Sequence, residues 1–349
     1  MKNYKRLAFI EGGLVLLLEL SCPQLVAPIF GSSIYTWAIL LCLAVLSLAI
    51  GYRIGGFLSN KNTGNHLLKK ITLLFGVTQV AIILGLISFK ILNTSILLND
   101  FFGLVLTVIF LQVLPLLCLG ATTPMLIELA SEKNKVIPGT IYSWSTFGGI
   151  LFSLLTGFVL IPEIGLTGTY ILALLLLSLI FIWLSFHYKL GKYKYVGASF
   201  FCVSALFFML KQPLPSSEKF TVIDYQEGLN GQLLVGDYSY NKNVDRILFI
   251  NRMGQTWVNK SNNFSTWSYP TLVTALGSMY KPNSNVLILG LGGGILAKNM
   301  RELARHRVDA VEFDKRIINI AYDHFQLPKF GVKVYHEDAR LYLNKCEKK

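Results

Sequence analysis

The stretch Val286-Leu-Ile-Leu-Gly290-Leu-Gly292-Gly-Gly294 joins an apolar strand to a glycine-rich turn. Beyond it the pattern alternates, predicting a helix at Ile295–Ala304, a strand at Val308–Glu312, a helix at Arg316–Phe325 and a strand at Val332–His336. Strands that alternate with helices indicate a parallel sheet with crossover helices. We therefore expect residues 285–349 to form an α/β domain built on a parallel sheet.

The glycines of this turn indicate a nucleoside site. Small residues let the backbone approach a ligand closely, and the N-terminus of the following helix presents free N–H groups. A dinucleotide fingerprint needs glycine or alanine at position 295, where this chain has Ile295. The pattern of Gly290, Gly292 and Gly294 instead favours an adenosyl ligand of the S-adenosylmethionine type.

Two acids follow the next two strands. Glu312 comes 22 residues after Gly290, near the roughly 20-residue offset at which a carboxylate meets ribose hydroxyls. Asp338 follows the third strand beside Ala339, where a carboxylate can accept a hydrogen bond from an adenine amino group. We predict that these residues bind the nucleoside together with the glycine loop.

Residues 212–284 are predicted to form a linker and a small β-strand domain. A Pro/Ser-rich segment opens this region, and β-branched runs follow at Phe220–Tyr225, Gln232–Asp237 and Arg246–Asn251. The segment Gly228–Gly231 is predicted to be the turn between the first two strands.

Residues 1–211 have the composition of a membrane domain. The whole chain is 53% hydrophobic and only 15% charged, against roughly 25% charged in soluble domains, which excludes an ordinary soluble protein and a disordered one. Apolar runs of bilayer-spanning length recur at Leu7–Ala27, Trp37–Leu58, Leu67–Phe89, Phe101–Ala130, Ile141–Ile161 and Tyr170–His187, with a shorter run at Val196–Leu210. We expect an α-helical integral membrane bundle of about seven spans, its fourth helix kinked or broken by Pro115 and Pro124.

The net charge of +13 follows membrane topology rather than nucleic-acid binding. Twelve lysines and arginines lie in alternate gaps between the apolar runs, and the opposite gaps hold only Lys90 before the last run. Positive residues favour the cytoplasmic side, so we expect a multi-pass protein of the bacterial cytoplasmic membrane with a cytoplasmic N-terminus. The C-terminal domain lies outside if Val196–Leu210 crosses the bilayer and inside if it does not.

Ionisable residues are rare within membrane-spanning segments, because their burial in lipid is costly. Glu19 and Glu128 nevertheless lie in the apolar runs. Two interpretations remain open: both acids lie at interfaces or hydrogen-bond within the bundle, or they belong to a polyamine or proton path. The five cysteines and five histidines show no metal-ligand spacing, so no metal site is expected.

Three blocks of the C-terminal region resemble the spermidine synthase family of aminopropyltransferases. They are Val286–Gly294, Val308–Asp314 and Val332–Arg340, and the upstream residues that agree are Tyr225, Gly231–Val235, Arg246–Gln255 and Tyr269. The N-terminal half resembles the multi-span proteins in which such a domain is fused to a membrane region. That likeness lies in Glu19, Pro28–Trp37, Gly120–Pro124 and Gly157–Pro162.

The resemblance implies that residues 285–349 form the N-terminal half of a Rossmann-like, methyltransferase-type α/β domain that binds a nucleoside. It also implies a role for each matched residue. Gly290, Gly292 and Gly294 cradle the nucleoside, Glu312 holds its ribose, and Asp338 holds its adenine. Gln255 and Tyr269 face the amine substrate. The implied co-substrate is decarboxylated S-adenosylmethionine, or S-adenosylmethionine, with no permanently bound cofactor, and a polyamine such as putrescine is the acceptor.

The chain departs from the family at several positions. Gly293 stands where the soluble family has an acid that contacts the aminopropyl ammonium, Asn251-Arg252 replaces Asp-Gly, and Pro270 replaces a polar residue. No residue matches the catalytic aspartate, so the catalytic residue is unknown. We expect a chain truncated before that aspartate and inactive alone, whose activity the full-length version or a complementing C-terminal half restores. The expected protein partner is a second copy in a homo-oligomer or that C-terminal half.

Two other functions fit the same residues. The chain could be a transport or sensor protein whose C-terminal domain only binds an adenosyl ligand, or it could be an S-adenosylmethionine-dependent methyltransferase. A catalytic aspartate encoded downstream distinguishes the aminopropyltransferase from both alternatives.

Overall fold

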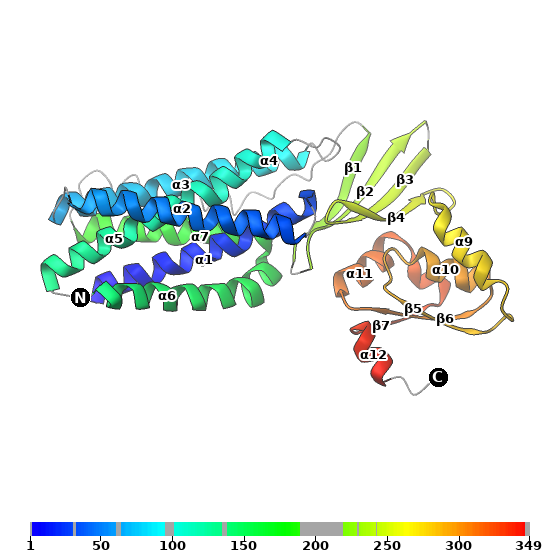
Figure 1. The fold of residues 1–349 in the computed structure, drawn as a ribbon. Helices are drawn as coiled ribbons and strands as arrows, with labels where there is room; N and C mark the ends of the chain where they lie inside the picture. Colours follow the sequence, from blue (N-terminus) through cyan, green and yellow to red (C-terminus); the bar gives the residue numbers. More distant parts are fainter. Residues whose placement is uncertain are drawn as a thin grey trace. The chain divides into compact units, whose positions relative to one another are not determined.

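The chain divides into two compact units in a computed structural model (Figure 1). Unit 1 comprises Met1–Pro213 with Glu227–Leu229, and unit 2 comprises Leu214–Gln226 with Asn230–Lys349. The structure describes residues 2–30, 33–60, 64–94, 101–134, 138–188, 219–228, 230–241 and 243–345.

Long helices make up the described part of unit 1 up to residue 188. They are α1 (Lys2–Phe30), α2 (Ile34–Asn60), α3 (Gly64–Thr94), α4 (Phe101–Val108), the π-helical η1 (Ile109–Val113), α5 (Leu114–Asn134), α6 (Pro138–Leu155), the π-helical η2 (Thr156–Leu160) and α7 (Ile161–His187). Most of these helices are apolar around their whole circumference, as expected of helices that face either a core or lipid.

Five helical segments are long and apolar enough to cross a membrane: Asn3–Ala27, Ile34–Asn60, His66–Phe89, Phe102–Ser131 and Pro138–His187. They correspond to the six long apolar runs of the sequence, because the last segment, of 50 residues, contains two of those runs. Gly165, with φ 72° and ψ 178°, breaks the helix between the two. The seventh predicted span, Val196–Leu210, lies outside the described residues.

The fourth segment stays helical through both of its prolines. Pro124 lies inside α5, and the π-helical turn η1 comes just before Pro115. A proline cannot donate a backbone hydrogen bond, and a π-helical turn is one way in which a helix absorbs such an interruption. The irregularity expected of this helix is therefore a local change of hydrogen bonding.

Helices α1 and α6 approach each other closely through glycine. A Cβ atom on Gly148 would lie 1.7 Å from the Phe9 carbonyl oxygen, and one on Gly12 would lie 2.1 Å from the Ser145 carbonyl oxygen. Small residues permit such backbone approach between membrane helices. Any side chain at either glycine would push the two helices apart.

The most deeply buried of the described acids in unit 1 is Glu11, which is 2% exposed. Its carboxylate accepts a hydrogen bond from the Thr123 hydroxyl (3.0 Å) and another from the Ser145 hydroxyl (3.1 Å), so it joins α1 to α5 and α6. The sequence pattern had instead singled out Glu19 and Glu128, which are only half-buried.

Unit 2 contains a four-stranded antiparallel sheet in the order β1-β2-β3-β4. Its strands are β1 (Phe220–Gln226), β2 (Leu233–Tyr240), β3 (Asn243–Ile250) and β4 (Met253–Asn259). The first three correspond to the strands predicted from the sequence. The fourth was not predicted as a separate strand, and it follows a tight turn in which Asn251 and Arg252 have φ values of 50° and 63°.

The second sheet of unit 2 is parallel, in the order β5-β6-β7. Its elements, with the preceding helix, are α9 (Ser268–Gly277), β5 (Asn285–Leu289), α10 (Ile295–Glu302), β6 (Arg307–Glu312), α11 (Lys315–His324), the short 3₁₀ helix η3 (Leu327–Phe330), β7 (Lys333–His336) and α12 (Ala339–Lys345). The predicted parallel sheet with helical crossovers is confirmed, and its boundaries agree to within about two residues.

One apolar core holds unit 2 together. Buried side chains of the antiparallel sheet, such as Val235 and Leu248, pack in the same cluster as Ile295 of α10 and Ile317 of α11. Figure 1 shows α10 and α11 on the face of the parallel sheet that looks toward β1–β4. This packing brings strand β4 beside the loop that follows β5.

Candidate functional site

The loop between β5 and α10 has the conformation that its glycines permit. Gly290, Gly292 and Gly294 have φ values of 89°, 55° and 79°, a left-handed region that other residues enter only with strain. The Gly290 N–H donates to the Val311 carbonyl oxygen at 2.8 Å, which ties the loop to β6. A Cβ atom on Gly290 would meet nothing within 4 Å, so the loop faces open space there.

Glu312 fastens this loop to the end of β6. One carboxylate oxygen accepts the Leu291 N–H at 2.9 Å, and the other accepts the Asp314 N–H at 3.0 Å. The side chain is only 5% exposed. A carboxylate offers about four lone-pair sites, so Glu312 can accept from a ligand hydroxyl while it keeps both backbone contacts.

Thr256 of β4 holds the loop from the other sheet. Its hydroxyl oxygen accepts the Gly293 N–H at 2.8 Å. A Cβ atom on Gly293 would lie 2.6 Å from the Thr256 Cγ2 atom, so the threonine occupies the space that a side chain at position 293 would need. The antiparallel sheet thus fixes the loop and prevents it from carrying the acid that the resemblance led us to look for.

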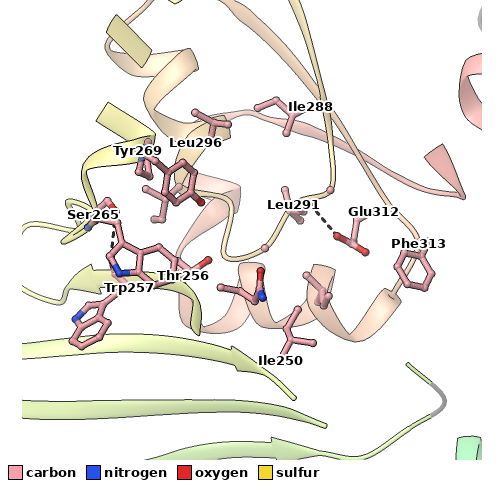
Figure 2. Close-up of a pocket in the computed structure, with 17 residues that line it drawn as sticks. Ile250, Thr256, Trp257, Ser265, Tyr269, Ile288, Leu291, Leu296, Glu312 and Phe313 are labelled. Carbon is pink, nitrogen blue, oxygen red and sulfur yellow. Dashed lines mark hydrogen bonds between the residues drawn. The ribbon is translucent and has the colours of Figure 1, made fainter. Parts of the chain in front are cut away.

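A cavity of about 330 Å³ opens over this loop, at the lower end of the usual range for small-molecule sites. The described residues that line it are Ile250, Gln255, Thr256, Trp257, Ser265, Trp267, Tyr269, Pro270, Ile288, Gly290, Leu291, Gly292, Ile295, Leu296, Glu312, Phe313 and Ile317. Figure 2 shows Tyr269, Ser265 and Trp257 on one side, Glu312 and Phe313 on the other, and Leu291 between them.

The cavity brings together residues that the sequence predicted for two different ligands. Gly290, Gly292 and Glu312, predicted for the nucleoside, line it beside Gln255 and Tyr269, predicted for the amine. These residues come from β4, α9, β6 and the loop after β5, so the fold joins segments up to 57 positions apart.

Three residues predicted for the nucleoside do not line the cavity. Gly294 is the N-cap of α10. Asp338 accepts the backbone N–H groups of Arg340 (2.9 Å) and Leu341 (3.1 Å) and so caps α12, which begins at Ala339. The adenine contact expected of Asp338 and Ala339 stays a prediction.

Asp314 stabilises the region next to Glu312. It caps α11 by accepting the Arg316 N–H, and it pairs with the Arg316 guanidinium at 2.7 Å. Although burial alone would raise the pKa of Asp314, the hydrogen bonds and charge of Arg316, with a hydrogen bond from Asn230, hold that pKa below its ordinary value. The carboxylate therefore stays ionised and keeps the helix cap in place.

Several lining residues were not predicted from the sequence. Thr256 and Trp257 are the two residues after the matched Gln255, Trp267 lies two positions before Tyr269, and Phe313 follows Glu312 directly. Aromatic residues next to matched positions are the signal that could have found three of them. Thr256 gave no such signal, because its role depends on the packing of β4 against the loop.

Over most of its length the chain is similar to a protein of Aquifex aeolicus. It is 20% identical over 358 residues to "Polyamine aminopropyltransferase 2" of Aquifex aeolicus (strain VF5), an alignment that spans 98% of this chain and 69% of that protein. No family model matches the chain, and no solved structure matches it. The likeness supports the spermidine synthase resemblance at the level of the family.

Proposed function

We propose that the chain is a membrane-bound, spermidine-synthase-like aminopropyltransferase. It transfers an aminopropyl group from decarboxylated S-adenosylmethionine to a polyamine such as putrescine. The observation that carries the proposal is the cavity in which the glycine loop and Glu312 meet Gln255 and Tyr269. The 20% identity to a polyamine aminopropyltransferase over nearly the whole chain supports the same activity.

The described residues suggest how an adenosyl ligand binds. The sugar lies over Gly290, where the absence of a side chain leaves open space. The sugar hydroxyls donate to the remaining lone pairs of the Glu312 carboxylate. Phe313, which is 55% exposed and lines the cavity, offers a ring face to the adenine. The substituted sulfur then points toward Gln255 and Tyr269.

The reaction is a displacement at carbon. The lone pair of a neutral amine nitrogen attacks the carbon next to the sulfonium, the carbon–sulfur bond breaks, and its electron pair returns to sulfur. The products are the alkylated amine, which gives up a proton, and neutral methylthioadenosine. The site contributes mainly by holding the nitrogen, carbon and sulfur in line, and the group that accepts the proton is not assigned.

We further propose that unit 1 spans the membrane several times with the N-terminus in the cytoplasm. Five apolar helical segments of sufficient length support the anchoring, and the basic residues in alternate gaps support the orientation. Cysteine labelling at Lys61 and Lys90, on opposite predicted sides, tests it. Labelling of Lys90→Cys from the cytoplasm would contradict the orientation.

Binding and transfer are tested separately on the purified protein in detergent. We expect calorimetry to show methylthioadenosine binding that Glu312→Gln weakens and Glu302→Gln, at an exposed position of α10, leaves unchanged. Tighter binding of a dinucleotide would contradict the assignment of the loop. Transfer is measured on the protein at its natural length, as methylthioadenosine release that depends on both decarboxylated S-adenosylmethionine and putrescine.

A further inference from the structure

The two sides of the cavity differ in charge. Glu312 is the single carboxylate among the described lining residues, and no lysine or arginine is among them. The opposite side carries two aromatic residues whose rings lie close together, Trp267 and Tyr269, which we call the aromatic wall. Figure 2 shows Tyr269 across the loop from Glu312. A ligand that spans the cavity therefore has its far end against rings.

The aromatic wall is held in place by hydrogen bonds of its own. The Trp267 N–H donates to the Ser265 hydroxyl oxygen at 3.1 Å. The Thr266 N–H donates to the Trp257 carbonyl oxygen at 2.9 Å, which ties the segment carrying Trp267 to β4. The Trp267 and Tyr269 rings lie 6.0 Å apart at an interplanar angle of 42°. The rings are thus positioned before any ligand binds.

The loop itself supplies no anion to this side. Position 293 is glycine, and the Thr256 methyl group occupies the space that a side chain there would need. Both Glu312 oxygens already accept backbone N–H groups on the other side. A positive charge bound against the wall therefore meets ring faces, which attract cations through their quadrupole.

We infer that the aromatic wall recognises the charged sulfur of an adenosyl sulfonium, in preference to the neutral sulfur of the corresponding thioether. The inference rests on the proposed function, because it assumes an adenosyl ligand in this cavity. A sulfonium is alkylated and has no N–H to satisfy, which is the kind of cation that aromatic cages select. Transfer neutralises the sulfur and removes this attraction, so the wall also favours release of the thioether product.

A matched pair of ligands tests the inference on the full chain in detergent. Methylthioadenosine and its S-methylated sulfonium differ by one methyl group and one charge. We expect calorimetry to show tighter binding of the sulfonium by about threefold to thirtyfold. This ratio should fall toward one in Trp267→Leu and remain above one in Trp267→Phe, which keeps a ring.

Two further variants keep the test decisive. Tyr269→Leu, at a 50% exposed position that tolerates change, should also lower the ratio if Trp267→Leu does not fold. Glu312→Gln should weaken both ligands and preserve the ratio. A ratio that collapses only in Glu312→Gln, or equal wild-type affinities for the two ligands, would overturn the inference and leave the proposed function standing. If neither nucleoside binds the wild type, the proposed function and the inference fall together.

Discussion

Each unit has a carboxylate that is almost completely buried at a junction between elements, and the two units satisfy these carboxylates by different means. Glu11 in unit 1 is 2% exposed and accepts from two side-chain hydroxyls, whereas Glu312 in unit 2 is 5% exposed and accepts from two backbone N–H groups. Helices use nearly all their backbone N–H groups internally, so a helical bundle must offer side chains as donors. A loop after a strand has backbone donors to spare.

Because their hydrogen-bond donors differ, the two carboxylates connect different kinds of elements. Glu11 joins three helices through Thr123 and Ser145, so its contacts depend on how closely those helices pack. Glu312, at the end of β6, joins the loop after β5 to the loop after β6, so its contacts depend on the shape of these loops. Changes that separate helices should therefore act on Glu11, and changes in loop shape should act on Glu312.

The largest effect is expected from Gly148→Leu. A side chain there would collide with the Phe9 carbonyl and separate α1 from α6, which also removes Ser145 from Glu11. We expect unit 1 to lose more than about 3 kcal/mol of stability. The measurement is the yield of monodisperse protein in detergent, with Gly139→Ala as the control because a Cβ atom there meets nothing within 4 Å. Equal yields for both variants would contradict the close packing.

The next largest effect is expected from Glu312→Gln. An amide keeps the shape but turns an N–H donor toward one of the two backbone N–H groups, which then loses its acceptor. We expect a loss of about 1–3 kcal/mol in nucleoside affinity. Titration calorimetry gives the value. A variant that binds as tightly as wild type would show that loop shape does not depend on this carboxylate.

A smaller effect is expected in the bundle from the pair Glu11 and Thr123. In a double-mutant cycle with Glu11→Gln and Thr123→Val, we expect a coupling of about 0.6 kcal/mol, and at most about 1.7. The readout is thermal unfolding in detergent. Thr122 is the control, because its hydroxyl donates to the Leu119 carbonyl oxygen. Coupling of Glu11 to Thr122 as large as that to Thr123 would contradict a direct contact.

The smallest effect is expected from lowering the pH, which protonates Asp314 beside Glu312 in unit 2. The folded protein lowers the pKa of Asp314 below its ordinary value of 3.8. The ionised carboxylate therefore stabilises the fold at any pH above 3.8, and this contribution is lost as the pH falls through the lowered pKa of the folded state. Asp314→Asn keeps a capping side chain but removes the titration. Unfolding temperatures at pH 5 and pH 3 should therefore differ less in the variant, by the equivalent of about 0.3 kcal/mol.

Much of the parallel sheet could be predicted because its signals are local. Apolar strands followed by glycine or an acid marked the ends of β5 and β6 to within about two residues, and the matched positions Gly290, Glu312, Gln255 and Tyr269 proved to share one cavity. Their common place follows from the packing of the parallel sheet and its helices against the antiparallel sheet, which only the structure shows.

The parts that could not be predicted depend on contacts between distant segments. Strand β4 is a strand because it pairs with β3, and Thr256 matters because it reaches Gly293 across the two sheets. Glu11 could not be ranked above Glu19, because both lie in one helix that is apolar on all sides. Periodicity indicates burial only where one face of a helix is polar.

Gly165 has a consequence for how unit 1 enters the membrane during synthesis. The described residues 138–187 form one apolar segment of 50 residues, and Glu163 is the only Asp, Glu, Lys or Arg in it. No charged loop separates the two apolar halves, so neither half is polar enough to remain in water while the other inserts into the bilayer. We expect the insertion machinery to receive them together as a hairpin that bends at Gly165, where φ is 72° and a bulkier residue would hinder the bend.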